Sequence, residues 1–274
     1  MSNPPKKIEL IALDMDGTLL NSQHDISEYT IDVITKVRAK GIKVVLVTGR
    51  PYIGTVKFTE KLSMREDNDY VIVCNGSLTI KPKTGEVVTQ ETLDINDYYE
   101  LEALSRELNV HFHVFDKDNV YTANKDISPY TILETQLTGI ALKFRTPEEM
   151  PKEMQFPKMM MIDEPEVLNQ AIAKLPPSLY ERYNIIKSAP YFLEIIPKGV
   201  NKGLTLKKLA HKLGIPAEHI LAMGDQGNDI AMFEFAGYSV AMGNAIDELK
   251  EIADGVAETN DNDGVGKTIE KFCL

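Results

Sequence analysis

The chain has 274 residues, of which 43% are apolar and 26% are charged, and this composition suits a globular protein with one large domain or with a core domain that carries a second lobe. The formal net charge of -11 provides no basic surface for nucleic acid or anionic lipid, and no apolar run approaches the roughly 18 residues of a membrane-spanning helix. The two cysteines, Cys74 and Cys273, have no C-x-x-C or Cys/His spacing, which argues against a disulfide framework and a structural zinc site.

The N-terminal stretch, residues 1–13, has two lysines and then a brief apolar run that leads directly into Asp14. This run is too short and wrongly flanked for a secretory signal, so we expect a cytoplasmic protein that binds neither membranes nor nucleic acid. The apolar part, residues 8–13, predicts a short buried strand.

The next segments alternate between helix and strand. A helix is predicted over residues 27–40, closed by Gly41, and Pro51 suits the first turn of a second helix. Buried strands are predicted over residues 43–47 and 70–74. Strand, helix, strand, helix, strand at this spacing predicts an α/β fold with a doubly wound parallel sheet.

From about residue 83 the pattern becomes a mixture of strands and helices punctuated by prolines. Helices are predicted at 94–108 and 129–137, and strands at 110–115, 158–162 and 192–196. After residue 199 the earlier alternation returns, with a helix at 201–213, a strand at 219–223 and a helix from near Asn228. We therefore predict a discontinuous core of residues 1–82 and 197–274, interrupted by a cap of residues 83–196.

Polar residues follow each predicted core strand at its carboxyl end. Ligands of open parallel sheets bind at these ends, where the loops converge and helix N-termini point inward. The residues concerned are Asp14 and Asp16, Thr48 and Gly49, Asn75 and Gly76, and Asp225, Asn228 and Asp229.

The aspartates are candidates for a metal site. Asp14 leaves its strand, Gly17 permits a tight turn, and Asp225 is expected to face Asp14 and Asp16. Carboxylates gathered in this way repel one another unless a hard dication such as Mg²⁺ lies among them. The alternative is that each aspartate caps a helix or forms a turn. A calcium loop is excluded because its required sixth-position glycine is Leu19.

Two further features suit a phosphorylated ligand. Thr48 and Gly49 offer a hydroxyl and backbone amides at a helix start, where anions bind. Lys202, beside the aspartates, would neutralise a phosphoryl group. Taken alone, the first pair is also ordinary loop chemistry and the lysine an ordinary surface charge.

Four segments, taken in order, resemble the motifs of haloacid dehalogenase-type phosphatases. They are Asp14-Met-Asp-Gly-Thr-Leu-Leu20, Val47-Thr-Gly-Arg50, Lys198-Gly-Val-Asn-Lys-Gly203 and Gly224-Asp-Gln-Gly-Asn-Asp229. The position of the insertion and the segment Pro-Lys-Gly-Val-Asn-Lys-Gly resemble those of the Cof-type branch. The resemblance implies a Rossmann-like core and an inserted α+β cap that closes over small phosphosugar-like substrates.

The resemblance also implies a role for each motif residue. Asp14 would form an aspartyl-phosphate, and Asp16 would act as general acid and then general base, with Lys202 as a third catalytic residue. Mg²⁺ would be held by Asp14, by the backbone carbonyl of Asp16 and by Asp225, while Asp229 would support the metal or orient Lys202. The phosphoryl oxygens would be bound by Met15, Thr48, Gly49, Lys202 and Asn228.

The implied activity is Mg²⁺-dependent hydrolysis of small phosphorylated metabolites, with sugar phosphates expected by analogy and a monomer or homodimer as the working form. Three alternatives stay open: a phosphomutase of similar fold, a non-catalytic phosphosugar-binding regulator, and a dehalogenase, which would have no use for Asp16 or a metal. In the cap, Lys143, Arg145, Arg182 and Tyr183 could reach the substrate or could be surface and packing residues.

Overall fold

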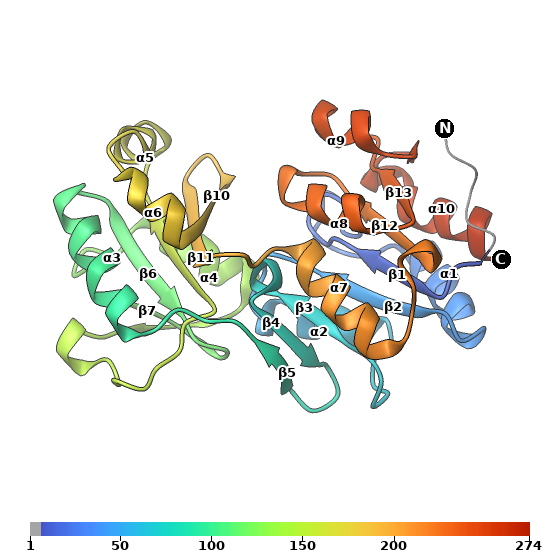
Figure 1. Ribbon diagram of the computed structural model, residues 1–274, viewed down its shortest axis with the longest axis horizontal. Coiled ribbons are helices and arrows are strands. Elements are labelled where there is room, and N and C mark those ends of the chain that lie inside the picture. Colours follow the sequence, from blue (N-terminus) through green and yellow to red (C-terminus); the bar gives the residue numbers. More distant parts are fainter. Residues whose placement is uncertain (1–6) are drawn as a thin grey trace. The chain divides into compact units, whose positions relative to one another are not determined.

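The computed structural model describes residues 7–274, so residues 1–6 of the N-terminal stretch lie outside the described part (Figure 1). The chain forms two compact units. The first comprises the residues up to Gly49, Val56–Val88 and Asn201–Leu274, and the second comprises Arg50–Thr55 and Thr89–Val200.

The first unit is built on an eight-stranded sheet in the order β14-β13-β12-β1-β2-β3-β4-β5. The strands are β1 (Leu10–Leu13), β2 (Lys43–Val47), β3 (Val71–Val73), β4 (Leu78–Lys81), β5 (Glu86–Gln90), β12 (Ile220–Gly224), β13 (Tyr238–Ala241) and β14 (Gly255–Val256). All neighbours from β14 to β3 pair in parallel, and Leu10 of β1 lies opposite both Ile220 and Lys43. The predicted α/β fold with a parallel core sheet is therefore confirmed.

Helices connect the parallel strands of this sheet, as parallel pairing of successive strands requires. They are α1 (Glu28–Ala39), α2 (Ile53–Lys61), α7 (Lys202–Leu213), α8 (Ile230–Phe235), α9 (Asp247–Ile252) and α10 (Gly264–Cys273), with 3₁₀ turns η1 (Cys74–Gly76), η3 (Ala217–His219), η4 (Gly227–Asp229) and η5 (Asn260–Asn262). In Figure 1, α7 and α8 cross the near side of the sheet. The ends of α1 agree with the prediction, because Ser27 caps its first turn and Gly41 follows it with φ of 84°.

Three details differ from the sequence prediction. Strand β3 ends at Val73 instead of residue 74, because Cys74 and Asn75 have left-handed φ angles of 51° and 54° that no strand contains. Pro51 is not in α2, which begins at Ile53; it lies in the turn before this helix, and its carbonyl accepts a hydrogen bond from the amide of Gly54. Strands β4, β5, β13 and β14 were not predicted, and β4 runs antiparallel to β3.

The second unit contains a six-stranded sheet in the order β10-β11-β9-β6-β7-β8. Its elements are α3 (Ile95–Glu107), β6 (His111–Phe115), β7 (Asn119–Thr122), α4 (Pro129–Thr138), β8 (Ala141–Phe144), η2 (Pro147–Glu149), β9 (Lys158–Ile162), α5 (Pro165–Ile172), α6 (Pro177–Arg182), β10 (Tyr183–Ala189) and β11 (Phe192–Pro197). Only β7 and β8 pair in parallel, so the unit is α+β, as predicted.

Strand β9 divides the apolar core of this unit between the two faces of its sheet. Met159 and Met161 belong to a cluster that includes residues of α3, α5 and α6, whereas Met160 and Ile162 belong to a second cluster on which Tyr130 of α4 packs. Successive side chains of a strand point to opposite faces. Three helices therefore cover one face of this sheet, and α4 lies on the other.

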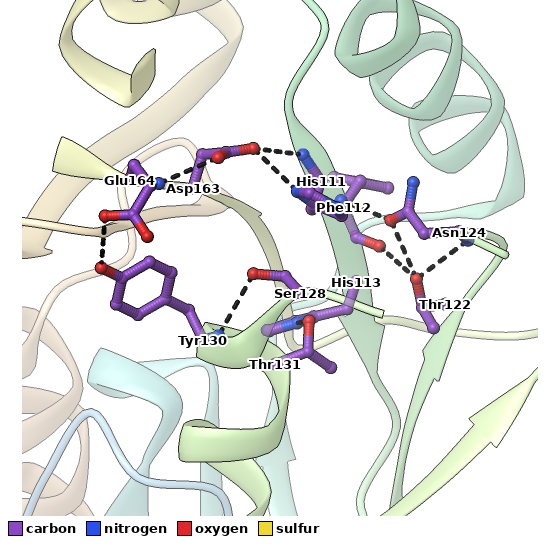
Figure 2. Close-up of polar contacts among 10 residues, drawn as sticks. All are labelled: His111, Phe112, His113, Thr122, Asn124, Ser128, Tyr130, Thr131, Asp163 and Glu164. Carbon is purple, nitrogen blue, oxygen red and sulfur yellow. Dashed lines mark hydrogen bonds and ion pairs between the residues drawn. The ribbon is translucent and has the colours of Figure 1, made fainter. Parts of the chain in front are cut away.

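Polar contacts anchor the start of α4, as Figure 2 shows. The Ser128 hydroxyl accepts a hydrogen bond from the Tyr130 amide, and the Tyr130 hydroxyl donates to Glu164. Beneath the helix, Nδ1 of the fully buried His113 lies 3.2 Å from the Thr131 hydroxyl. The helix is thus held to the sheet by hydrogen bonds as well as by apolar packing.

Within residues 7–274, no helix has the length and apolar character required to cross a membrane.

Candidate active site

The loop after β1 carries the first aspartate of the candidate site. Asp14 is 5% exposed and its amide donates to the carbonyl of Met223 in β12, so it continues the sheet pairing before the chain turns. Gly17 has φ of 79°, and a Cβ there would lie 2.4 Å from Asp225 Oδ2. Only glycine satisfies both conditions, and Asp225 can therefore approach the loop closely. The Thr18 hydroxyl donates to Asp225 Oδ1 over 2.9 Å and fixes this approach.

Lys202 lies at the start of α7 and is 1% exposed. Its Nζ atom is 2.6 Å from Asp14 Oδ1 and 2.7 Å from Asp229 Oδ1. The helix begins here because Asn201 caps it by accepting a hydrogen bond from the Leu204 amide. The buried ammonium group thus bridges the carboxylates of residues 14 and 229, which lie 215 positions apart in the sequence.

Burial and charge set the protonation of this pair. Burial raises the pKa of Asp14 well above its usual value, the charges of Asp229 and Asp225 raise it further, and Lys202 opposes them. Burial alone would lower the pKa of Lys202, but the charges of Asp14 and Asp229 outweigh it, so that this pKa is raised. The two carboxylates therefore favour the charged form of Lys202, and additional positive charge near Asp14 would favour its ionised form.

Asp229 is fully buried and both of its oxygens have partners. Oδ1 forms an ion pair with Lys202, and Oδ2 accepts hydrogen bonds from the amides of Asp225 and Gln226, at 2.9 and 3.1 Å. A Cβ at Gly224 would lie 2.6 Å from this side chain, which shows how closely the two pack. Asp229 thereby orients both the lysine and the loop that carries Asp225.

The geometry suits a hard cation. Asp14, Asp225 and Asp229 each offer one oxygen, and these atoms lie within 4.8 Å of one another. Burial, followed by the charge of Asp229, raises the pKa of Asp225, and Lys202 lowers it. An all-oxygen donor set fits Mg²⁺. The side chain of Asp16 is exposed and is not a member of this cluster.

The predicted phosphate ligands lie in neighbouring loops of the same unit. Thr48 is 1% exposed at the end of β2, and its amide donates to the carbonyl of Ile72. The Met15 carbonyl accepts from the Leu20 amide over 2.8 Å, which shapes the loop after β1. Asn228 lies in η4, and its Nδ2 atom donates to Asn75 Oδ1 over 3.0 Å.

Sequence reasoning missed two residues of this arrangement, Thr18 and Asn75. Thr18 belongs to the first motif, and its position close to Asp14 and Asp16 in the sequence could have indicated a role in the site. Asn75 follows the third predicted strand and was noted there only as a polar strand end. Both act through partners more than 150 positions away, Asp225 and Asn228. No local pattern indicates such contacts.

Three of the four cap candidates have partners inside the second unit that a packing role would explain. Tyr183 is 2% exposed, and its hydroxyl donates to Asp97. Arg182 forms an ion pair with Glu100 and also donates to the Tyr183 hydroxyl. Arg145 is exposed and donates to the carbonyl of Phe144, its neighbour in the chain. The fourth, Lys143, has its Nζ atom 5.8 Å from the centre of the Tyr121 ring.

Comparisons with known proteins agree on one family. Residues 11–269 match the family described as haloacid dehalogenase-like hydrolase. The chain is 42% identical to "Putative phosphatase YxeH" of Bacillus subtilis (strain 168), over 97% of this chain and 98% of that protein. It is 32% identical to the 5-amino-6-(5-phospho-D-ribitylamino)uracil phosphatase YcsE of the same organism, over 97% and 96% of the two chains. It is also similar to the crystal structure of a haloacid dehalogenase-like hydrolase from Bacteroides thetaiotaomicron, with TM-score 0.89, 32% identity and coverage of 97% and 99%.

Proposed function

The chain belongs to the haloacid dehalogenase-like hydrolases and is a phosphatase of that family, and we propose that it hydrolyses small phosphate monoesters, with Mg²⁺ as cofactor and Asp14 as covalent nucleophile. The observation that carries this proposal is the buried cluster in which Lys202 bridges Asp14 and Asp229 beside Asp225. Buried charges cost desolvation energy, which only close ion pairing and hydrogen bonding offset. Here these charges surround the carboxylate that would attack phosphorus.

In the first step an Asp14 oxygen attacks phosphorus, and the bond between phosphorus and the ester oxygen breaks. Asp16 donates a proton to the departing alcohol. In the second step Asp16 takes a proton from water, whose oxygen attacks the aspartyl-phosphate and releases phosphate and the Asp14 carboxylate. Support for these roles comes from burial, because Asp14 is enclosed beside Lys202 whereas Asp16 is exposed and can exchange protons with solvent and substrate.

The remaining groups position and neutralise the phosphoryl group. Lys202 fixes Asp14 Oδ1 in place and supplies one positive charge. We assign the binding of the phosphoryl oxygens to Met15, Thr48, Gly49, Lys202 and Asn228. Phosphoryl transfer depends mostly on positioning and charge neutralisation, so these contacts would supply much of the rate enhancement.

We assign the metal to the carboxylates of Asp14 and Asp225 and to the backbone carbonyl of Asp16, which would together hold Mg²⁺. When bound, it supplies the positive charge that keeps Asp14 ionised and draws charge from the phosphoryl oxygens. Asp229 is assigned an orienting role instead, because its two oxygens already engage Lys202 and the amides of residues 225 and 226.

The proposed substrates are sugar phosphates and similar phosphorylated metabolites, selected by a cap formed by residues 83–196. The relative YcsE is named for a substrate with a phosphorylated ribityl chain. This name supports a phosphorylated polyol as the substrate class. Most of the proposed cap belongs to the second unit, whose compactness supports a separate role.

The proposal is tested with purified protein and p-nitrophenyl phosphate, first with Mg²⁺ and then with EDTA. We expect turnover that requires Mg²⁺, followed by release of inorganic phosphate from a panel of sugar phosphates. A protein that converts a sugar phosphate to its isomer only when a sugar bisphosphate is added would be a mutase instead. Absence of turnover on all of these esters with Mg²⁺ would contradict the proposal.

A further inference from the structure

The turn after β3 has an unusual backbone. Cys74, Asn75 and Gly76 have successive φ angles of 51°, 54° and 108°. Left-handed conformations are unfavourable for residues other than glycine, although asparagine tolerates them better than most. Two such residues in succession are kept only where the surroundings enforce them, and strained backbone of this kind gathers at functional sites. Asn75 is also 1% exposed, so its side chain is enclosed by the protein.

The contacts of Asn75 join two segments of the candidate active site. Its amide donates to the carbonyl of Thr48 over 3.0 Å, and its Oδ1 atom accepts from Asn228 Nδ2 over 3.0 Å. Its side chain also lies against Gly49, where a Cβ would come within 3.1 Å of Asn75 Nδ2. Asn75 therefore contacts three of the residues to which we assign phosphoryl binding: Thr48 through its backbone amide, and Gly49 and Asn228 through its buried carboxamide.

The same turn is fastened to the helix that carries Lys202. The Gly76 carbonyl accepts a hydrogen bond of 2.8 Å from the Thr205 hydroxyl in α7. A Cβ at Gly76 would lie 2.6 Å from the carbonyl oxygen of Asn201, the N-cap of this helix. The turn is thus held against three segments of the chain: the loop after β2, the 3₁₀ turn η4 and the start of α7.

We infer that Asn75 is a positioning residue for phosphoryl binding, an inference that rests on the proposed function. The Nδ2 group of Asn228 carries two hydrogens, and the contact with Asn75 Oδ1 uses one of them, so the other remains for a phosphoryl oxygen. Asn75 acts through Asn228 and Gly49 and does not itself touch the substrate. A displacement of about 1 Å in such a group can cost roughly 100-fold in rate.

The test compares Asn75→Gly with Ser77→Ala in the same turn. Glycine accepts the left-handed backbone and removes the carboxamide. Ser77 is 1% exposed, and its hydroxyl has no hydrogen-bond partner among the described residues, which makes it a matched control. We expect Asn75→Gly to lower kcat/KM for p-nitrophenyl phosphate by about 10- to 100-fold and to weaken inhibition by inorganic phosphate, while Ser77→Ala leaves both unchanged.

A double-mutant cycle with Asn228→Ala separates positioning from general damage. Because Asn75 acts through Asn228 as well as Gly49, Asn75→Gly should cost less in the Asn228→Ala background than in the wild type. Effects on kcat/KM that multiply would contradict the inference.

Should Asn75→Gly prove too unstable to assay, Asn75→Asp keeps the shape of the side chain and places a negative charge against the binding residues. This variant should weaken inhibition by inorganic phosphate at least tenfold. Inhibition equal to that of the wild type would contradict the inference.

The outcomes also distinguish the inference from the function on which it rests. A wild-type protein without Mg²⁺-dependent turnover would overturn the proposed function, and this inference with it. Normal turnover in both the wild type and Asn75→Gly would overturn the inference alone.

Discussion

Charge balance within the cluster decides how the buried residues around Asp14 can work. Three carboxylates, those of Asp14, Asp225 and Asp229, face one ammonium group, that of Lys202, so full ionisation leaves a net charge of -2 (one positive minus three negative). Burial raises the pKa of both Asp14 and Asp225 by removing the charged carboxylates from water, and the charge of Asp229 raises both further. A single dication restores neutrality and favours the ionised nucleophile.

Replacement of Asp14 by asparagine is the first prediction at this scale. Asp14→Asn removes the nucleophile while it preserves the volume, so kcat should fall by about 10⁴-fold or more. The fold should persist, because the amide is neutral in a site where a carboxylate is costly. Steady-state kinetics and thermal unfolding check both points, with the exposed Asp32→Asn as control. A variant that keeps near wild-type turnover would exclude Asp14 as the nucleophile.

Replacement of Asp225 tests the metal site without any assay of activity. A ligand that binds only the folded state stabilises it in proportion to RT ln(1 + [L]/Kd). Millimolar Mg²⁺ should therefore raise the unfolding midpoint of the wild type and should have a much smaller effect on Asp225→Asn, which lacks one charged donor. Scanning calorimetry with Mg²⁺ and with EDTA measures the difference. Equal shifts in the two proteins would place the metal elsewhere.

His113 predicts a pH dependence of stability. Burial, followed by the charge of Lys158, lowers its pKa to about 3, whereas an unfolded chain has a value of about 6.5. The unfolded state therefore binds a proton first as the pH falls, so stability is complete above pH 6.5 and is lost progressively between about 6.5 and 3. Between pH 7 and 5 this residue should lower the free energy of unfolding by an amount on the order of 2 kcal/mol.

The measurement for His113 is urea unfolding at pH 7 and pH 5. His113→Gln should lose less stability over this interval than the wild type, because glutamine does not titrate. The exposed His211→Gln serves as control and should follow the wild type. If His113→Gln and the wild type lose the same stability, the histidine is not held neutral by the fold.

Among the elements, α7 is the one whose position matters most, since it carries Lys202. Gly203 lies against α8 so closely that a Cβ would be 2.0 Å from the carbonyl oxygen of Ala231. Gly203→Ala should push the two helices apart, cost about 1–3 kcal/mol or more, and lower kcat by displacing Lys202. In Gly255→Ala the new Cβ would meet ordinary contacts at 3.6 Å and should change little. Unaltered stability and kcat in Gly203→Ala would show that the helices tolerate separation.

Element prediction from sequence succeeded where periodicity and capping residues agree. Helix α1 is marked by Ser27 and Gly41, and the core strands appear as short apolar runs that end in polar residues. The prediction erred at Cys74, since an apolar residue after a strand gives no sign that its φ angle is positive. It also placed Pro51 in a helix that begins two residues later, because proline suits turns and first helical turns alike.

For the molecule as a whole, motif order was the strongest signal in the sequence. The alternation of strands and helices predicted the fold class, which the sheet topology and the structural comparisons confirm, and four short segments in the right order indicated the family. The same order led to the candidate site residues, of which Asp14, Lys202, Asp225 and Asp229 meet in the buried cluster. The contacts of Thr18 and Asn75 could not be predicted, since they join residues separated by 207 and 153 positions.

The central claim, a covalent phosphoryl group on Asp14, can be tested by trapping it. The protein is mixed with excess p-nitrophenyl phosphate and Mg²⁺, quenched with borohydride during turnover, and digested for mass spectrometry. Borohydride reduces an aspartyl-phosphate to homoserine, so the account predicts homoserine at position 14 and none there in Asp14→Asn. Vigorous turnover with position 14 intact, or with the reduced residue elsewhere, would contradict it.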